Sequence, residues 1–307
     1  MGWLRKPRIS CWLILGLSCF VAGSAPAQSP IPGHYPPGQS GLRGAATPGP
    51  GIVITNFNRF FSNLERIDSD GLPVAEVQET RYANVTMISW TTTLRILGMA
   101  YGALAGIPFS TGNLRPADND VGSTALGLGD VLLTPLSLYG KSSAFDYQIQ
   151  FTLWSSSGHF EPGGTENRGT GFWSLVYSVG GVFYPGGDRK AWSLSAVARF
   201  GQNFEQEGTG VRPGDDLVID SGLGRSFVLW GLPIEAGASG FAVWQLTAQT
   251  DANGTASPER YRYFGLGPEA SASLTDRLGF VVRAQWEFGT RNAVEGNNLW
   301  LILKYRP

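Results

Sequence analysis

Polar side chains that can bind or guide a solute recur at every second position in several short segments of the chain. In the clearest of these, Phe145 to Leu153, apolar and polar residues alternate strictly. Because successive side chains of a β-strand point to opposite faces, the polar members of each segment share one face. Charged and amide groups on such a face can orient a solute. The residues that we expect to line this solute path are Asp146, Gln148, Gln150, Trp154, Arg199, Glu235, Glu269, Arg283, Gln285 and Glu287.

This mixed set of charges fits two arrangements. It can form a polar pore with a constriction, or it can form salt bridges that fill a narrow interior. Apolar residues such as Trp154, Val176 and Phe241 fall on the same expected face. Polar and apolar groups together suit an amphipathic solute, such as a small aromatic or acyl compound.

The two histidines offer little for metal binding. His159 lies in an expected loop with Glu161 and Glu166 nearby, where it can either capture a solute or be simply solvated. Both cysteines, Cys11 and Cys19, lie close to the amino terminus. With no thiolate beside the histidines, we expect neither a metal site nor a cofactor.

The composition excludes several classes of protein. Glycine accounts for 42 of 307 residues and aromatic residues for 12 %, whereas charged residues reach only 15 %, against about 25 % in a typical soluble domain. This combination argues against a helical enzyme, a coiled coil and a disordered chain. The net charge of −1 gives no electrostatic basis for a nucleic-acid partner.

The amino-terminal residues are typical of a secretory signal peptide. Basic residues and an apolar run precede an A-x-A cleavage site at Ala25–Ala27, so we expect residues 1–27 to be removed. Residues 28–50 are rich in proline and glycine and form either a flexible lead-in or a plug that folds back into a cavity. We expect residues 51–307 to form one domain.

Period-2 alternation predicts twelve β-strands in this domain. The expected strands span 52–61, 82–92, 97–109, 124–138, 144–154, 172–184, 191–200, 216–228, 233–247, 260–274, 278–288 and 298–305. Long loops alternate with short turns between them. The expected long loops span 62–81, 110–122, 155–171, 201–215, 248–259 and 289–297.

This layout is typical of an all-β fold, an up-and-down antiparallel β-barrel of the outer-membrane type with long extracellular loops and short periplasmic turns. Aromatic residues at the ends of the apolar faces resemble interfacial girdles. In hydrocarbon every backbone group must be paired, so the sheet must close without an edge. An even strand count places both termini on the periplasmic side. A secreted β-sandwich or barrel that buries its apolar face in a core is the alternative.

Two expected strands carry a charge on their apolar side. Asp130 and Arg225 each follow a Gly-Leu-Gly triplet, and an arginine that faces the middle of a bilayer costs about 2–4 kcal/mol. A β-bulge reverses the register locally, so we interpret these triplets, and a third at Gly265–Gly267, as bulges or sites of tight curvature. Pro135 and Pro268 indicate further bulges.

A series of short motifs runs along most of the expected barrel and the segment before it. They are Gly33-His34-Tyr35-Pro36-Pro37-Gly38, Gly51, Asn56-Phe57, Gly127-Leu128-Gly129-Asp130 with Pro135, Phe145-Asp146-Tyr147, Gly158-His159-Phe160, Gly169-Thr170-Gly171 and Tyr184-Pro185. In this order they resemble the meta-pathway phenol degradation family. The resemblance implies an outer-membrane β-barrel of a Gram-negative bacterium that takes up hydrophobic substrates, and it supplies no catalytic residues.

Together these features favour an outer-membrane channel for passive uptake of small hydrophobic or aromatic compounds, which the resemblance links to phenol degradation. A general small-solute channel, an anchor for displayed loops and an outer-membrane lipid enzyme are the alternatives. Twelve-stranded outer-membrane phospholipases place a serine two residues after a histidine, whereas Glu161 follows His159 and Pro36 follows His34, so we expect no enzyme. The expected partners are outer-membrane lipid and lipopolysaccharide, the barrel assembly machinery and the solute.

Overall fold

The computed structural model describes residues 30–111, 126–164 and 167–307, and these residues are mainly β-strand. The strands are β1 (Gly51–Ile67), β2 (Pro73–Ile96), β3 (Met99–Ser110), β4 (Gly127–Leu128), β5 (Leu132–Lys141), β6 (Phe145–Trp154), β7 (Ser174–Phe183), β8 (Trp192–Asn203), β9 (Asp216–Leu229), β10 (Leu232–Gln245), β11 (Arg262–Ser273), β12 (Leu278–Arg291) and β13 (Ala293–Tyr305). Two short 3-10 helices, η1 (Gly41–Arg43) and η2 (Pro185–Gly187), accompany them. Within the described ranges, no helix has the length and hydropathy needed to cross a membrane.

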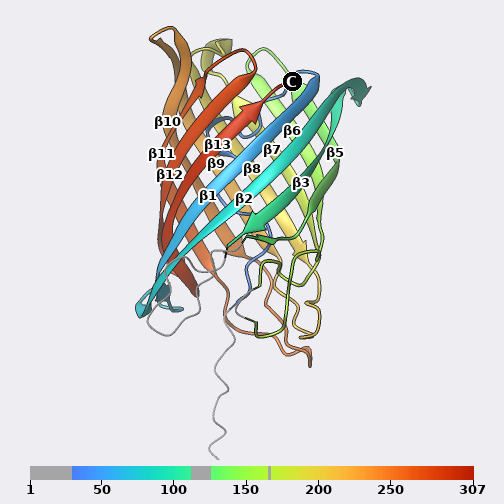
Figure 1. Ribbon diagram of the computed structural model, residues 1–307, viewed down its shortest axis with the longest axis vertical. Helices are drawn as coiled ribbons and strands as arrows, with labels where there is room; N and C mark the ends of the chain where they lie inside the picture. The colour runs from blue at the N-terminus through green and yellow to red at the C-terminus, as the bar shows by residue number, and fades with distance from the viewer. Residues whose placement is uncertain (1–29, 112–125, 165–166) are drawn as a thin grey trace, which may run out of the picture.

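The strands form one closed antiparallel sheet (Figure 1). Neighbours along the chain pair with each other, except that the two-residue β4 lies beside β3, which also pairs with β5. β1 pairs with β2 on one side and with β13 on the other, which closes the sheet. All of the thirteen strands except β4 therefore form a twelve-stranded up-and-down barrel, as the sequence predicts.

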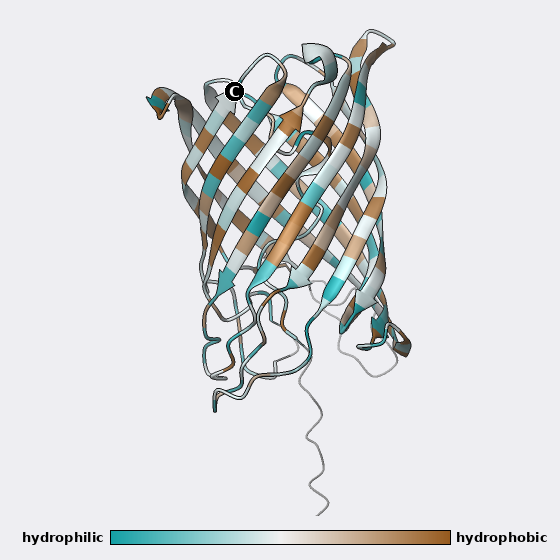
Figure 2. Cartoon of the chain, turned by 180° about the vertical axis from the view of Figure 1, so that it is seen from behind, coloured by the Kyte–Doolittle hydropathy of each residue, from teal (hydrophilic) through white to brown (hydrophobic). Residues whose placement is uncertain are grey.

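The outer face of this barrel is mostly apolar. Large outward side chains such as Ile149, Val179 and Leu223 are 46 %, 59 % and 50 % exposed. Figure 2 shows apolar and polar residues alternating along the strands, so the opposite faces of the sheet differ in hydropathy. Apolar surface of this extent is stable against hydrocarbon rather than water. The chain is an outer-membrane type β-barrel, and its outer surface belongs in a bilayer.

The two ends of the barrel have different connections. At the short-turn end, β2–β3 and β9–β10 are joined by tight turns in which Leu97 and Trp230 have a φ of +51°. The long connections, including 204–215, 246–261 and the described residues of 155–173, lie at the opposite, long-loop end. Both ends of the barrel wall, Gly51 and Tyr305, lie at the short-turn end, because each pairs with residues beside the short turns.

Two of the expected long loops are wrong, because they are mostly strand. β1 and β2 continue to Ile67 and from Pro73, so only a short turn remains of the loop expected at 62–81. β12 and β13 likewise continue to a turn at Asn292 in place of the loop expected at 289–297. These extensions carry polar pairs such as Asn63 with Glu79. Strand that leaves the bilayer has water on its outer face, so it lacks the alternation that reveals a membrane strand.

The expected local change of register occurs near Asp130 but not at Arg225. Asp130 lies in the break between β4 and β5, and the pairing of β5 with β6 shifts around Pro135. At Arg225 the pairing of β9 continues without a shift, so there is no bulge. Arg225 instead faces outward at the short-turn end, 5.5 Å from the ring centre of Trp192. At the membrane interface an arginine can reach water.

The bulges expected at Gly265–Gly267 and Pro268 are also absent. Ala238 and Ser239 of β10 pair in regular register with Pro268 and Gly267 of β11. Neither the Gly265–Gly267 triplet nor Pro268 disturbs that pairing. The sheet accommodates these residues without an extra residue in either strand.

One outward patch between β1 and β2 is polar rather than apolar. The amide of Asn58 donates to Asn56 Oδ1 at 2.8 Å, and the amide of Asn84 donates to Asn58 Oδ1 at 2.9 Å. The hydroxyl of Tyr82 donates to the same Asn58 oxygen at 2.6 Å. Mutual hydrogen bonding reduces the cost of holding amides in hydrocarbon.

Ile149 and Phe145 of β6 provide a test of the membrane position, because both are 46 % exposed and differ in depth. We expect Ile149→Arg to destabilise the folded barrel by about 2–4 kcal/mol and Phe145→Arg, at the strand end, by about 0–1 kcal/mol, because the cost of lipid-facing arginine falls toward the interface. Urea unfolding of each variant in lipid vesicles measures the difference. Equal effects at the two positions would contradict a membrane-spanning β6.

Candidate functional site in the barrel lumen

Residues 30–50 run through the inside of the barrel and are called the interior segment below (Figure 1). Within it, Leu42 and Ala45 are only 2 % and 0 % exposed, and η1 contacts β8, β9 and β10. The backbone N–H of Ile31 donates to Gln249 Oε1 at 2.9 Å in a connection at the long-loop end. The segment therefore starts at that end and reaches β1 at the short-turn end. The expectation that both termini lie at the short-turn end holds for the barrel wall but not for this segment.

Asp220 of β9 is the central attachment point of the interior segment. One carboxylate oxygen accepts the N–H of Gly38 at 2.8 Å. The other accepts the hydroxyl of Tyr35 at 2.6 Å and the N–H of Ser40 at 3.1 Å, and it forms an ion pair with Arg199 at 3.1 Å. The side chain of Asp220 is nearly fully buried. A buried carboxylate is stable only when its oxygens are hydrogen-bonded in this way.

Two glutamates of the wall attach η1. Glu269 of β11 pairs with Arg283 of β12 at 2.6 Å and accepts the N–H of Leu42. Glu235 of β10 pairs with Arg43 at 2.7 Å. Both glutamates are buried, so the two arginines neutralise charges that have little contact with water.

Asp146 of β6 holds the last part of the segment near the short-turn end. One of its oxygens accepts the N–H of Thr47 at 3.2 Å and the hydroxyl of Tyr184 at 3.1 Å, and it pairs with Arg189 at 2.8 Å. Ala45 packs in a buried apolar cluster that includes Tyr184. The segment is thus bonded to the wall at several points along its length.

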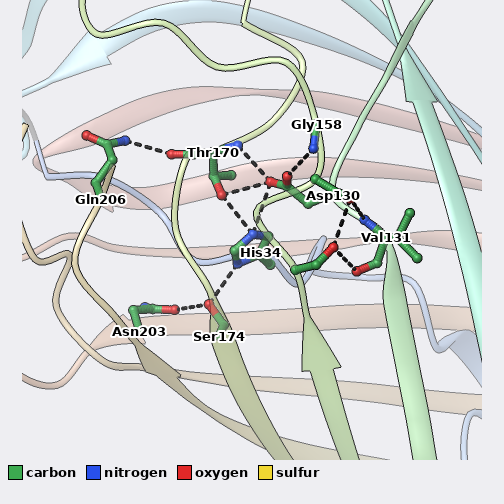
Figure 3. A network of polar contacts seen from close by, with 10 residues as sticks. His34, Asp130, Val131, Gly158, Thr170, Ser174, Asn203 and Gln206 are labelled. Carbon is green, nitrogen blue, oxygen red and sulfur yellow. Dashed lines mark hydrogen bonds and ion pairs between the residues drawn. The ribbon is translucent and has the colours of Figure 1, made fainter. Parts of the chain in front are cut away.

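His34 holds the first part of the segment near the long-loop end (Figure 3). Its Nδ1 lies 2.7 Å from the hydroxyl of Ser174, which itself donates to Asn203, so Nδ1–H is the donor. Its Nε2 lies 3.1 Å from Asp130 and 2.7 Å from the hydroxyl of Thr170. The ring is nearly fully buried, and these contacts form the His34 cluster.

Asp130 connects the His34 cluster to the long connection after β6. It accepts the N–H groups of Gly158 at 2.8 Å and Thr170 at 2.7 Å. Burial acts to raise the pKa of Asp130, but the hydrogen bonds and charge of His34 and the two N–H bonds lower it more, so the pKa lies below the ordinary value of 3.8. The ionised carboxylate therefore stabilises the contacts between the His34 cluster and the connection after β6.

The expected path residues all face the interior, but they do not all have the same surroundings. Asp146, Arg199, Glu235, Glu269 and Arg283 form ion pairs that involve or flank the interior segment. Gln148, Gln150 and Trp154 border the cavity that is described below. Gln285 is buried beside the segment, and Glu287 accepts hydrogen bonds from the N–H of Gly296 and the amide of Asn298. Their roles in solute passage stay predictions.

His159 lies apart from the lumen network. Its side chain is 56 % exposed, and its Nε2 lies 3.9 Å from a carboxylate oxygen of Glu161. Within the described residues, no group of three or more His, Cys, Asp or Glu is placed to hold a metal ion.

Sequence reasoning missed three residues of the lumen. Lys304 lies between Leu303 and Tyr305, and the positions that alternate with Asp220 include Leu217, Ile219 and Leu223, so the period-2 signal was available for both. His34 carries no such signal, because it lies in a segment without regular structure. Its partners Asp130 and Ser174 are 96 and 140 residues away along the chain.

A cavity of about 260 Å³ remains between the interior segment and one side of the wall. Near the long-loop end it is bounded by the apolar side chains of Leu132, Trp154 and Val176, which form one buried cluster. Toward the short-turn end it is bounded by polar groups, among them Gln148 and Lys304. His34 stacks on Trp154 with ring centres 5.4 Å apart, so the His34 cluster lies beside the apolar part.

Comparison with known proteins agrees with this architecture. The sequence matches the family described as "Putative MetA-pathway of phenol degradation" over residues 69–303, which is more than half of the chain. The chain belongs to this family. No curated protein matches the sequence.

A solved outer membrane channel has the same fold as this member of the phenol-degradation family. An outer membrane channel from Pseudomonas putida F1 superposes with a TM-score of 0.69 at 15 % identity, over 89 % of this chain and 99 % of that chain. The beta domain of the Bordetella autotransporter BrkA gives a TM-score of 0.48 at 14 % identity, over 83 % of this chain and 100 % of that chain. The likeness to the channel extends over nearly the whole barrel.

Asp220 provides a test of how the interior segment is held. We expect Asp220→Ala to lower the free energy of unfolding by about 3–5 kcal/mol, because it leaves Arg199 buried without its partner. Urea unfolding followed by tryptophan fluorescence measures the loss. Asp276→Ala in an exposed turn is the matched control, with a change of about 0.5 kcal/mol or less. An effect of Asp220→Ala no larger than that of the control would contradict the anchoring role.

The lowered pKa of Asp130 predicts how the His34 cluster responds to acid. A carboxyl whose folded pKa is depressed adds stability above its unfolded pKa and loses it as the pH falls through the folded pKa. We therefore expect the amides of Gly158 and Thr170 to stay protected from hydrogen exchange down to the ordinary value of 3.8 and to lose protection only below it. The amide of Tyr184, bonded to the carbonyl of Ala144, is the control. Loss of protection well above that pH would contradict a lowered pKa.

Proposed function

We propose that this protein is an outer-membrane channel through which small hydrophobic or aromatic compounds enter passively. The observation that carries the proposal is the cavity beside the interior segment. Its apolar part near the long loops, with Leu132, Trp154 and Val176, suits an aromatic ring. Its polar part continues toward the short-turn end, so an amphipathic compound has a partner along the whole path.

The comparisons support the same function. The family is described by a pathway of phenol degradation, and a barrel of the same fold is an outer membrane channel. A degradation pathway inside the cell requires its substrate to cross the outer membrane first. A channel for aromatic compounds meets that requirement without an energy source.

We propose that the interior segment acts as a plug that restricts this path. Its hydrogen bonds to Asp220, Glu269 and Asp146 hold it across the lumen, and the remaining cavity of about 260 Å³ is small. Ligand pockets commonly measure about 300–1,000 Å³. A narrow lumen admits a compound the size of one aromatic ring more readily than a sugar.

We propose that the protein is not an enzyme. A nucleophilic mechanism needs a base within hydrogen-bond reach of the nucleophile. His159 is exposed. His34 lies within reach of the hydroxyls of Ser174 and Thr170, but these hydroxyls donate to Asn203 and Asp130, so neither gives its proton to the imidazole. The expected partners are lipid around the wall, lipopolysaccharide at the long-loop end and the barrel assembly machinery during insertion.

The function can be tested with the full chain in vesicles whose outer leaflet is lipopolysaccharide. We expect phenol and toluene to enter faster than into protein-free vesicles, with little entry of arabinose or potassium ions. His34→Ala should increase entry of all four, because it removes the bonds that hold the segment beside Trp154. His159→Ala is the matched control and should leave entry unchanged.

Three outcomes would contradict the proposal. Equal entry of sugars, ions and aromatics would indicate a general small-solute channel. No entry in the wild type, in His34→Ala or after removal of the interior segment would indicate a barrel that only anchors its loops. Release of fatty acid from the vesicle lipid would indicate an enzyme.

A further inference from the structure

The cationic side chains around the lumen cavity are not matched by acidic ones. Four cationic residues line it, Arg43, Arg199, Arg283 and Lys304, and among the described residues that line it there is no aspartate or glutamate. The carboxylates of the lumen lie behind these cations, where they bond the interior segment. The open space of the barrel is therefore bordered by positive charge alone.

Three of these cations have a carboxylate partner. Arg43 pairs with Glu235, Arg199 with Asp220 and Arg283 with Glu269, at 2.7, 3.1 and 2.6 Å. Their charges are largely neutralised within the protein. They can donate hydrogen bonds to the cavity, but they add little net field to it.

Lys304 has no such partner in the part of the chain that the structure describes. In the sheet, Lys304 lies opposite Thr55 of β1 and Gly279 of β12, and among the described residues its ammonium group enters no ion pair or side-chain hydrogen bond. The charges that act on it from other elements are those of Glu269, Arg283 and Glu235. Both glutamates already belong to the arginine pairs, so the charge of Lys304 remains available.

The position of Lys304 complements the apolar part of the cavity. Lys304 lies near the end of β13, at the short-turn end, whereas Leu132, Trp154 and Val176 border the cavity toward the long loops. Between them, Gln148 and Gln150 of β6 offer amide groups to the same space. The path thus begins with apolar surface and ends at an unneutralised ammonium group.

We propose that the solutes of this channel include small organic anions with an apolar body, such as aromatic or acyl carboxylates, and that Lys304 binds their carboxylate. This inference rests on the proposed function and adds the charge of the substrate to it. The apolar surface around Trp154 takes the ring or chain. The ammonium of Lys304 then attracts the carboxylate toward the short-turn end.

The proposal can be tested by calorimetric titration of the full chain in lipid nanodiscs, with empty nanodiscs as the reference. The probes are benzoate and benzyl alcohol, which have similar bodies and differ in charge. Near neutral pH we expect benzoate to bind about tenfold more tightly than benzyl alcohol, equivalent to about 1.4 kcal/mol. Added salt should reduce this ratio, because ions screen the attraction.

Lys304→Gln should remove the preference for benzoate and leave the affinity for benzyl alcohol unchanged. Lys190→Gln is the matched control, because Lys190 lies in an exposed turn at the same end and does not line the cavity. The control should keep the wild-type ratio. Unchanged binding of benzyl alcohol also shows that Lys304→Gln is folded.

The outcomes separate this inference from the proposed function. Equal affinity of the wild type for the two probes, or a benzoate preference that survives in Lys304→Gln, would overturn the role of Lys304 while benzyl alcohol still binds and aromatics still enter vesicles. Failure of both probes to bind, together with failure of phenol to enter vesicles, would overturn both proposals.

Discussion

Every backbone N–H and C=O that is removed from water must find a partner within the protein, and the structure depends on this constraint twice. Outside, the hydrocarbon provides no hydrogen bonds, so the strands must close into a barrel. The pairing of β1 with β13 completes that closure. Inside, the interior segment has no strand of the wall to pair with, and its amides must find other acceptors.

Carboxylates of the wall accept four of these amides, and the side chains of Gln249 and Tyr261 accept those of Ile31 and Gly33. The N–H groups of Gly38 and Ser40 donate to Asp220, that of Leu42 donates to Glu269 and that of Thr47 donates to Asp146. The prolines of the segment have no N–H, which reduces the number of donors that need a partner. The proline- and glycine-rich composition is therefore compatible with a buried segment as well as with a flexible one. Buried carboxylates also need cations, which Arg199 and Arg283 provide.

This arrangement divides the lumen into a filled side and an open side. On the filled side, charges of both signs neutralise one another around the segment. On the open side, apolar surface near Trp154 and the free charge of Lys304 border the cavity. The two arrangements that the sequence left open, a polar pore and a salt-bridged filling, thus occur together in one barrel. The expected path residues belong partly to each, because alternation identifies the inward face but not what an inward residue touches.

The sequence by itself determined the barrel, its twelve strands and the residues that face inward, because the pleat of a strand makes alternation a local property of the chain. It also indicated a break near Asp130 and Pro135. Only the tertiary structure decided which inward groups meet, since His34 and Asp130 are 96 residues apart and are joined by the path of the interior segment. It also decided that β1, β2, β12 and β13 extend beyond the membrane, where both faces of a strand can be polar and the local signal disappears.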